Sequence, residues 1–199
     1  STAVAQMDST CLEANIHFPT DWVLLKDVSV SLLSGVKRIR TSGIVCRMPE
    51  SVEQLSRQMN VICMQMSQLR RKADAARLRK GCLRQMKRLL QRIGGHARRH
   101  RDALQIRGSD HGWSPARRDR LLERMDWHLQ QLPEVIHQAH ERIIGGRKLP
   151  RDKKILSIHD PDLQVIVRGK ASGEVEFGNS LFIVENSLGY ILDYQFDRT

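Results

Sequence analysis

Residues 51–69 read SVEQLSRQMNVICMQMSQL, and this stretch decides the fold class of most of the chain. Apolar side chains recur there at intervals of three and four residues, which places them on one side of an α-helix. The pattern resumes further on and predicts one long helix over about 50–93, with Gly94-Gly95 as its end. The apolar positions of the first stretch are Val52, Leu55, Met59, Ile62, Met66 and Leu69.

Two further helical patterns flank this stretch. Leu25, Val28, Leu32 and Val36 predict a helix that begins after Pro19, with Thr20 as its N-cap. A second seam runs from Leu122 to Ile143, and Pro133 is expected to kink or split it. The connections are short, so we expect an antiparallel helical bundle over about 21–150.

The chain is strongly basic, and the excess lies in one segment. Its 199 residues carry 33 Lys and Arg against 22 Asp and Glu, a net charge of +11. Residues 68–124 hold 18 of those bases and five acids, whereas the other residues hold 15 bases and 17 acids. Such a concentration of positive charge attracts polyanions, usually nucleic acid. The alternative roles for these side chains are a solvated helix face, contact with an acidic partner, or contact with another part of the same protein.

DNA contact through phosphates is the expectation for this segment, because no sequence-reading motif is present. His96 and His100, four residues apart, are expected to contact phosphate rather than zinc, and Trp113 could stack on bases. The predicted DNA-binding side chains within the segment are Arg70, Arg71, Lys72, Arg77, Arg79, Lys80, Arg84, Lys87, Arg88, Arg98, Arg99 and Arg101.

The two ends of the chain have the composition of strands. A short apolar run, Val4 to Met7, ends at Asp8, and residues 163–167 form another β-branched run. Residues 175–185 and 190–196 flank Asn186-Ser187-Leu188-Gly189, which predicts a β-hairpin whose strands are buried on both faces. The resulting fold class is α+β, divided into 1–20, a helical insertion over 21–150 and strands over 151–199.

Two sequence blocks resemble bacterial insertion-sequence transposases of the DDE class. The first, residues 8–25, reads DSTCLEANIHFPTDWVLL. The second contains Arg168-Gly169-Lys170 and then Glu176-Phe177-Gly178-Asn179, followed by Gly189-Tyr190-Ile191-Leu192. The resemblance covers about 55 residues at the motif level and implies an incomplete RNase H-like sheet, interrupted by the basic helical insertion.

The resemblance implies roles for individual residues. Asp8 matches the first of three catalytic, metal-binding acids, and Thr10, Glu13, Asn15 and Asp21 belong to the same block as supporting residues. Arg168 and Lys170 are expected to contact DNA near the scissile phosphate, with an Arg168–Glu176 pair as the alternative. The family's second Asp and its Glu have no matching block here. Asp193 and Asp197 are candidate substitutes, but Asp193 lies in a stretch that matches the family's ordinary hairpin strand and is not promoted to that role.

The function expected from this resemblance is DNA strand cleavage and transfer. Mg²⁺ is the implied cofactor of the complete site, because paired ions bound by carboxylates assist attack on phosphorus. A lone Asp is not expected to hold them, so the chain is interpreted as an inactive N-terminal-to-middle fragment. We further expect DNA as partner, the cytoplasm as location, no membrane association, and a full-length protein that could be a homodimer. The alternatives are a non-catalytic basic helical module that binds nucleic acid and a purely structural helical protein.

Overall fold

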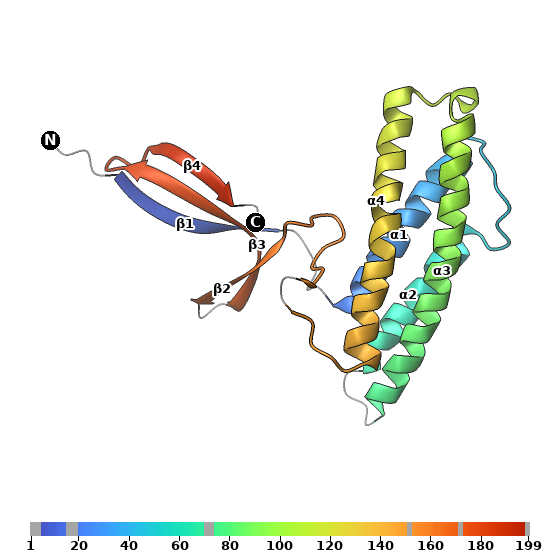
Figure 1. The fold of residues 1–199 in the computed structure, drawn as a ribbon, viewed down its shortest axis with the longest axis horizontal. Coiled ribbons are helices and arrows are strands. Elements are labelled where there is room, and N and C mark those ends of the chain that lie inside the picture. Colours follow the sequence, from blue (N-terminus) through green and yellow to red (C-terminus); the bar gives the residue numbers. More distant parts are fainter. Residues whose placement is uncertain (1–4, 15–19, 70–73, 151–152, 171–172, 198–199) are drawn as a thin grey trace. The chain divides into compact units, whose positions relative to one another are not determined.

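The computed structural model describes residues 5–14, 20–69, 74–150, 153–170 and 173–197, with backbone only at 168–170, 173, 174 and 197. Within these residues the chain is α+β, with four α-helices and a small open antiparallel sheet. It divides into two compact units, one of Ser1–Pro19 with His159–Thr199 and the other of Thr20–Ile158 (Figure 1). The helices therefore lie, in sequence, between β-strands of a single sheet that is formed by both ends of the chain.

The helical unit consists of α1 (Asp21–Thr41), α2 (Val52–Gln68), α3 (Ala75–Arg107) and α4 (Pro115–Ala139). Successive helices run in opposite directions (Figure 1), as expected from their short connections. Helix α1 packs against the other three, and ten of its residues are buried. Burying a Leu- and Val-rich face of this kind is the main stabilisation of such a unit, at about 25 cal/mol per Å² of apolar surface.

Local signals explain where α2 and α4 begin. The Ser51 hydroxyl accepts from the Gln54 backbone N–H at 3.1 Å, and the Gln54 side chain accepts from the Ser51 N–H at 2.7 Å. This reciprocal cap satisfies two N–H groups that the helix itself leaves unpaired. Pro115 stands in the first turn of α4, where its missing N–H costs nothing.

The prediction of one helix over 50–93 is wrong. Helix α2 ends at Gln68, and α3 begins at Ala75 and continues through Gly94-Gly95 to Arg107. Gly94 is an internal contact position, because a Cβ there would lie 3.0 Å from Cδ2 of Leu132 on α4. The glycine thus lets α3 and α4 approach closely instead of ending the helix.

Pro133 neither splits nor ends α4, which continues to Ala139. The flanking Leu132 and Val135 are 4% and 0% exposed, so their burial offsets the hydrogen bond that proline removes. A short π-helical turn, η3 (His140–Ile144), follows directly. None of the helices described is both long and apolar enough to cross a membrane.

The sheet consists of β1 (Ala5–Glu13), β2 (Gln164–Lys170), β3 (Gly173–Asn186) and β4 (Ile191–Asp197), all antiparallel. The long β3 is central and pairs with the other three strands. The β3–β4 hairpin lies where the sequence predicts it. However, burial on both faces is wrong: Tyr190, Ile191, Leu192 and Tyr194 are 60–70% exposed.

Candidate functional site

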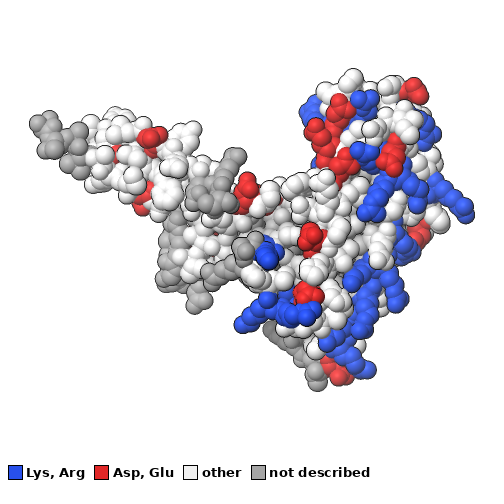
Figure 2. Space-filling model, viewed as in Figure 1, with Lys and Arg blue, Asp and Glu red and all other residues white. Residues whose placement is uncertain are grey.

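The outward face of α3 carries a line of cations. Successive residues on an α-helix differ by about 100°, so Arg77, Arg84 and Arg88 lie within about 40° of one another, opposite the buried face. Lys and Arg gather in a band along this helix, whereas the strands show a mostly uncharged surface (Figure 2). We call this line the α3 stripe; its members are Arg77, Lys80, Arg84, Lys87, Arg88, Arg98 and Arg99.

The α3 stripe has the length of one turn of a DNA duplex. From Arg77 to Arg99 the helix rises about 33 Å, and a duplex turn rises about 34 Å. Within the described residues, Lys80, Arg84, Arg88 and Arg98 have no acidic partner, so their charges are not compensated locally. Repeated cations of this kind suit a polyanion that presents charges at regular intervals.

Three stripe side chains have polar neighbours. Arg77 lies 3.4 Å from Asp74, Lys87 Nζ lies 3.3 Å from Nδ1 of His140, and an Arg99 Nη lies 2.7 Å from Nδ1 of His96. The exposed Arg77–Asp74 pair contributes little to stability, and a phosphate could replace Asp74 at small cost. These residues are therefore secondary members of the stripe.

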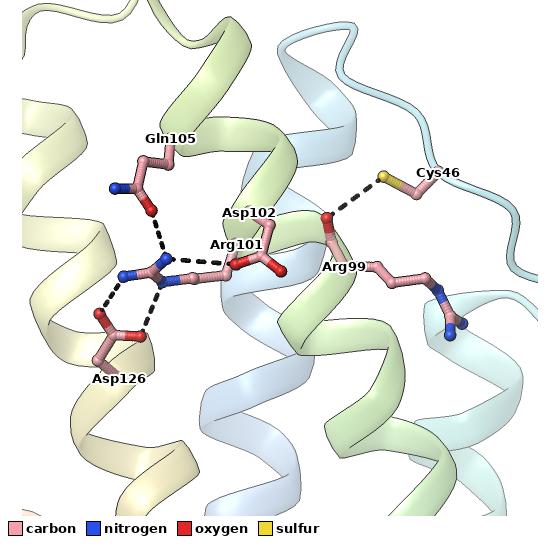
Figure 3. Close-up of polar contacts among 6 residues, drawn as sticks. All are labelled: Cys46, Arg99, Arg101, Asp102, Gln105 and Asp126. Atoms are coloured by element: carbon pink, nitrogen blue, oxygen red, sulfur yellow. Dashed lines mark hydrogen bonds and ion pairs between the residues drawn. The ribbon is translucent and has the colours of Figure 1, made fainter.

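Arg101, predicted to bind DNA, is engaged inside the helical unit (Figure 3). Its guanidinium donates to both carboxylate oxygens of Asp126 on α4 at 2.8 Å, and it also contacts Asp102 and Gln105. The hydrogen bonds that Arg101 donates to Asp126 raise the pKa of Arg101. This fork-to-carboxylate pair joins α3 to α4 and points away from Arg99 (Figure 3). We therefore assign Arg101 to helix packing instead of to the stripe.

Arg79 also departs from the stripe. It lies about 160° from Arg77 around α3, and its Nε is buried without a hydrogen-bond partner among the described residues. The predicted Arg70, Arg71 and Lys72 lie outside the described residues. Arg168 and Lys170 belong to β2 by their backbone, and their side chains lie outside the described part of the structure.

Two histidines are buried beneath the stripe. His96 and His100 are 7% and 0% exposed, so the prediction that they contact phosphate is wrong. His100 Nδ1 donates to the His96 carbonyl at 2.7 Å, which leaves Nε2 to accept from Arg40 at 3.3 Å. Burial, with nearby arginines, lowers the pKa of both histidines and keeps them neutral.

Trp113 is not available for base stacking. It is 5% exposed, its Nε1 donates to the Ser42 hydroxyl at 2.8 Å, and the guanidinium of Arg117 lies over its ring at 4.6 Å. The ring closes one end of the helical unit beside Gly43 and His111, where the His111 ring lies 3.2 Å from the Ser42 carbonyl. The tryptophan therefore packs the end of the bundle.

Asp8 lies in the sheet, but not at the end of its strand. It is the fourth residue of β1, because Ser9 and Thr10 continue the pairing with Phe182 and Leu181 instead of forming a turn. Its exposed carboxylate accepts from the Ser9 N–H at 2.7 Å. This strand lies beside the β3–β4 hairpin, and Asp8 is opposite Ile183 of β3.

Strand register separates Asp8 from Glu13 and Asp193, whereas Glu185, which pairs with Gln6, shares the face of Asp8. Directly paired residues share a face, so Asp8, Ile183 and Tyr194 lie on one face. Asp193 pairs with Val184 and lies on the opposite face. Glu13, five residues after Asp8, also lies on the opposite face and about 17 Å along the strand.

Thr10 is the only predicted supporting residue in the described part of β1 that shares the face of Asp8. No group of three or more His, Cys, Asp or Glu in the described residues could hold a metal ion. Asp8 alone does not fit a pair of Mg²⁺ ions, which need several hard oxygen ligands. The described residues therefore provide Asp8, one of the predicted catalytic acids, but they do not form a complete metal site.

Asp21 has a structural role within the helical unit. It is 5% exposed and accepts from Nη1 of Arg142 at 2.8 Å and from the Gln138 amide at 3.1 Å. Gln138 also donates to the Ile155 carbonyl and accepts from its N–H. These bonds tie the start of α1 to the end of α4 and to the returning chain. Asn15, the remaining predicted support, lies outside the described residues.

A groove between α2 and α3 was not predicted from the sequence. It encloses about 710 Å³ and is lined by Val61, Ile62 and Leu89, by glutamines, and by Arg57, Arg88 and Arg92. The sequence contains one sign of this groove: Val61 is an apolar residue that lies outside the helical seam. In the structure, Val61 is exposed. In comparisons with known proteins, no family model, no curated protein and no solved structure matches this chain.

Proposed function

We propose that the chain is part of a DDE-class DNA transposase, in which the helical unit binds DNA and the sheet carries the first catalytic acid. The observation that carries this proposal is that the two sequence blocks that resemble transposases pair with each other in one sheet. They lie at opposite ends of the sequence, yet β1 with Asp8 pairs along β3, and Glu13 is opposite Gly178 of the second block.

Gly178 supports the proposal because the pairing requires it. A Cβ at that position would lie 2.1 Å from the Leu12 carbonyl oxygen and 2.8 Å from the Cys11 sulfur. Real Cβ atoms do not approach backbone oxygen so closely, so only glycine fits between β1 and β2 here. The Glu-Phe-Gly pattern thus has a physical reason within the sheet that presents Asp8.

In this proposal, the α3 stripe holds the DNA backbone and positions it without reading bases. Asp8 supplies one hard oxygen ligand to Mg²⁺ in the complete enzyme. We assign no cleavage step to the described residues by themselves, because a single carboxylate does not complete that site.

The test is transposition by a complete protein that contains this chain. Asp8→Asn should abolish strand cleavage while leaving DNA affinity unchanged, since the substitution removes a ligand and no stripe residue. Asp193→Asn is the matched control, because it changes the same chemistry on the opposite face. Full cleavage by Asp8→Asn would remove Asp8 from the site.

A non-catalytic DNA-binding module is the second candidate. The specific observation in its favour is that the α3 stripe is formed entirely within the helical unit, Thr20–Ile158. This candidate predicts DNA binding by the chain with no metal dependence, measured by adding EDTA to the binding assay. Affinity that required Mg²⁺ would count against it.

A further inference from the structure

The groove between α2 and α3 has apolar walls and a cationic rim. Val61, Ile62 and Leu89 form the apolar part, and Val61 is 43% exposed although it lies beside a packed core. An exposed apolar surface with a polar rim is typical of an interaction surface, because leaving it in water costs free energy. The lining glutamines, Gln58, Gln65 and Gln85, add neutral donors and acceptors.

The rim is positive and partly preorganised. Arg57 and Arg88 are exposed and have no acidic partner among the described residues. Arg92 is fixed in place by Glu50, whose carboxylate lies 2.5 Å away, and by the Gln58 side chain at 3.1 Å. A side chain that is already held loses little entropy when a ligand arrives.

The dimensions of the groove fit a helix. Its α2 wall runs from Arg57 to Gln65, about 12 Å or just over two turns. Its α3 wall, Gln85 to Arg92, is of similar length. Two helices that are already packed side by side offer a concave seam, and an added helix can insert its apolar ridge there.

We infer that this groove docks an acidic amphipathic helix of a partner protein, an inference that goes beyond the proposed transposase function. Charge complementarity identifies the occupant. A second copy of this chain, docked groove to groove, would bring the uncompensated Arg57 and Arg88 towards the same two residues of the other copy, which is repulsive, whereas Arg92 is already paired with Glu50. DNA would leave the apolar walls uncovered by its phosphates, and none of the described residues that line the groove is an aromatic on which a base could stack.

The inference makes DNA and the partner competitors, because Arg88 belongs both to the α3 stripe and to the groove. A bound acidic helix would neutralise Arg88 and place negative charge beside the stripe. The docked partner would therefore weaken DNA binding in proportion to its occupancy.

The experiment uses the full chain and two labelled peptides of about 15 residues, a length at which isolated helices begin to form. Both carry leucines along one helical face; the first has glutamates on the flanking positions and the second has lysines instead. Fluorescence anisotropy at physiological salt should show saturable binding of the glutamate peptide and binding at least about tenfold weaker for the lysine peptide.

Val61→Gln places a good helix former at an exposed position and removes the apolar contact. It should weaken the glutamate peptide about tenfold. The control Ile106→Gln makes the same change at an 80% exposed position outside the groove and should bind like the unmodified chain. Equal binding of the two peptides, no binding of the glutamate peptide, or an unaffected Val61→Gln variant would overturn the inference.

Duplex DNA binding, measured on the same variants, separates this inference from the proposed function. Val61→Gln should leave DNA affinity unchanged, because Val61 is not in the stripe. A parallel loss of DNA affinity would assign the groove to nucleic acid and overturn the inference. Failure of the peptide with intact DNA binding refutes the docking site alone, and the reverse result refutes DNA binding alone.

Discussion

Neutralising three arginines of the α3 stripe should remove most of the salt dependence of DNA binding. The perturbation is the triple variant Arg84→Gln, Arg88→Gln and Arg98→Gln. All three side chains are exposed and have no acidic partner among the described residues, so the fold should be preserved. Arg120→Gln on α4 is the matched control for loss of an exposed arginine.

The magnitude follows from counterion release. If Lys80 and these three arginines each neutralise a phosphate, the slope of log affinity against log salt is about −3.6, at about −0.9 per contact. Raising salt from about 50 to 200 mM then weakens binding about 150-fold. The triple variant retains one such contact, so its slope becomes about −0.9 and the same change in salt weakens binding only about 3.5-fold.

The assay is anisotropy of a labelled duplex about 20 base pairs long, roughly two turns, titrated at several salt concentrations. The unmodified chain and Arg120→Gln should share the steep slope. If the triple variant has the same slope as the control, the α3 stripe is not the DNA-binding surface and the reasoning fails. Random-sequence duplexes should bind equally well, since the contacts are to phosphates.

Three further predictions concern stability. Asp21→Asn should lower the free energy of unfolding by about 2 kcal/mol in urea denaturation, because it leaves Arg142 without its buried partner; Asp119→Asn, in an exposed pair, should change it by less than about 0.5 kcal/mol. Gly178→Ala should detach β1 from β3, seen as fast amide exchange of β1 while the helices stay protected; slow exchange there would contradict the packing argument. The lowered pKa values of His96 and His100 mean that the unfolded chain takes up protons first, so stability should be constant above about pH 6.5 and fall below it by up to about 1.4 kcal/mol per pH unit for each histidine. His100→Gln should flatten that dependence, and an unchanged profile would exclude His100 as a cause.

The periodicity of the sequence predicts much of the helical unit, because side-chain spacing directly determines which face is buried. The seam from Leu55 to Met66 is buried as expected. The helix ends are less predictable, since they depend on neighbours that the local sequence does not contain. Gly94 resembles a helix end but serves contact with Leu132, and Pro133 resembles a break but is outweighed by the burial around it.

The sequence predicts which segment carries the positive charge, but it does not predict which of the basic side chains face outward. A list of basic residues does not distinguish Arg84, on the outward face, from Arg101, which lies about 100° away from it and binds Asp126. Likewise, Asp8-Ser9-Thr10 has the composition of a turn, but pairing with β3 keeps it extended. In both cases a long-range partner decides the outcome, and such a partner is invisible in the local pattern.

The hydrogen bonds of Asp21 and Gln138 have a consequence for how this architecture could arise and change. They bring the entrance and the exit of the helical unit together, with Ile155 beside α1 and α4. The helical unit is therefore a closed loop of chain, because the residues where it begins and ends are hydrogen-bonded to the same side chain, Gln138. A segment whose two ends lie together can be inserted, removed or exchanged at one point of a chain, because the gap that it leaves is short.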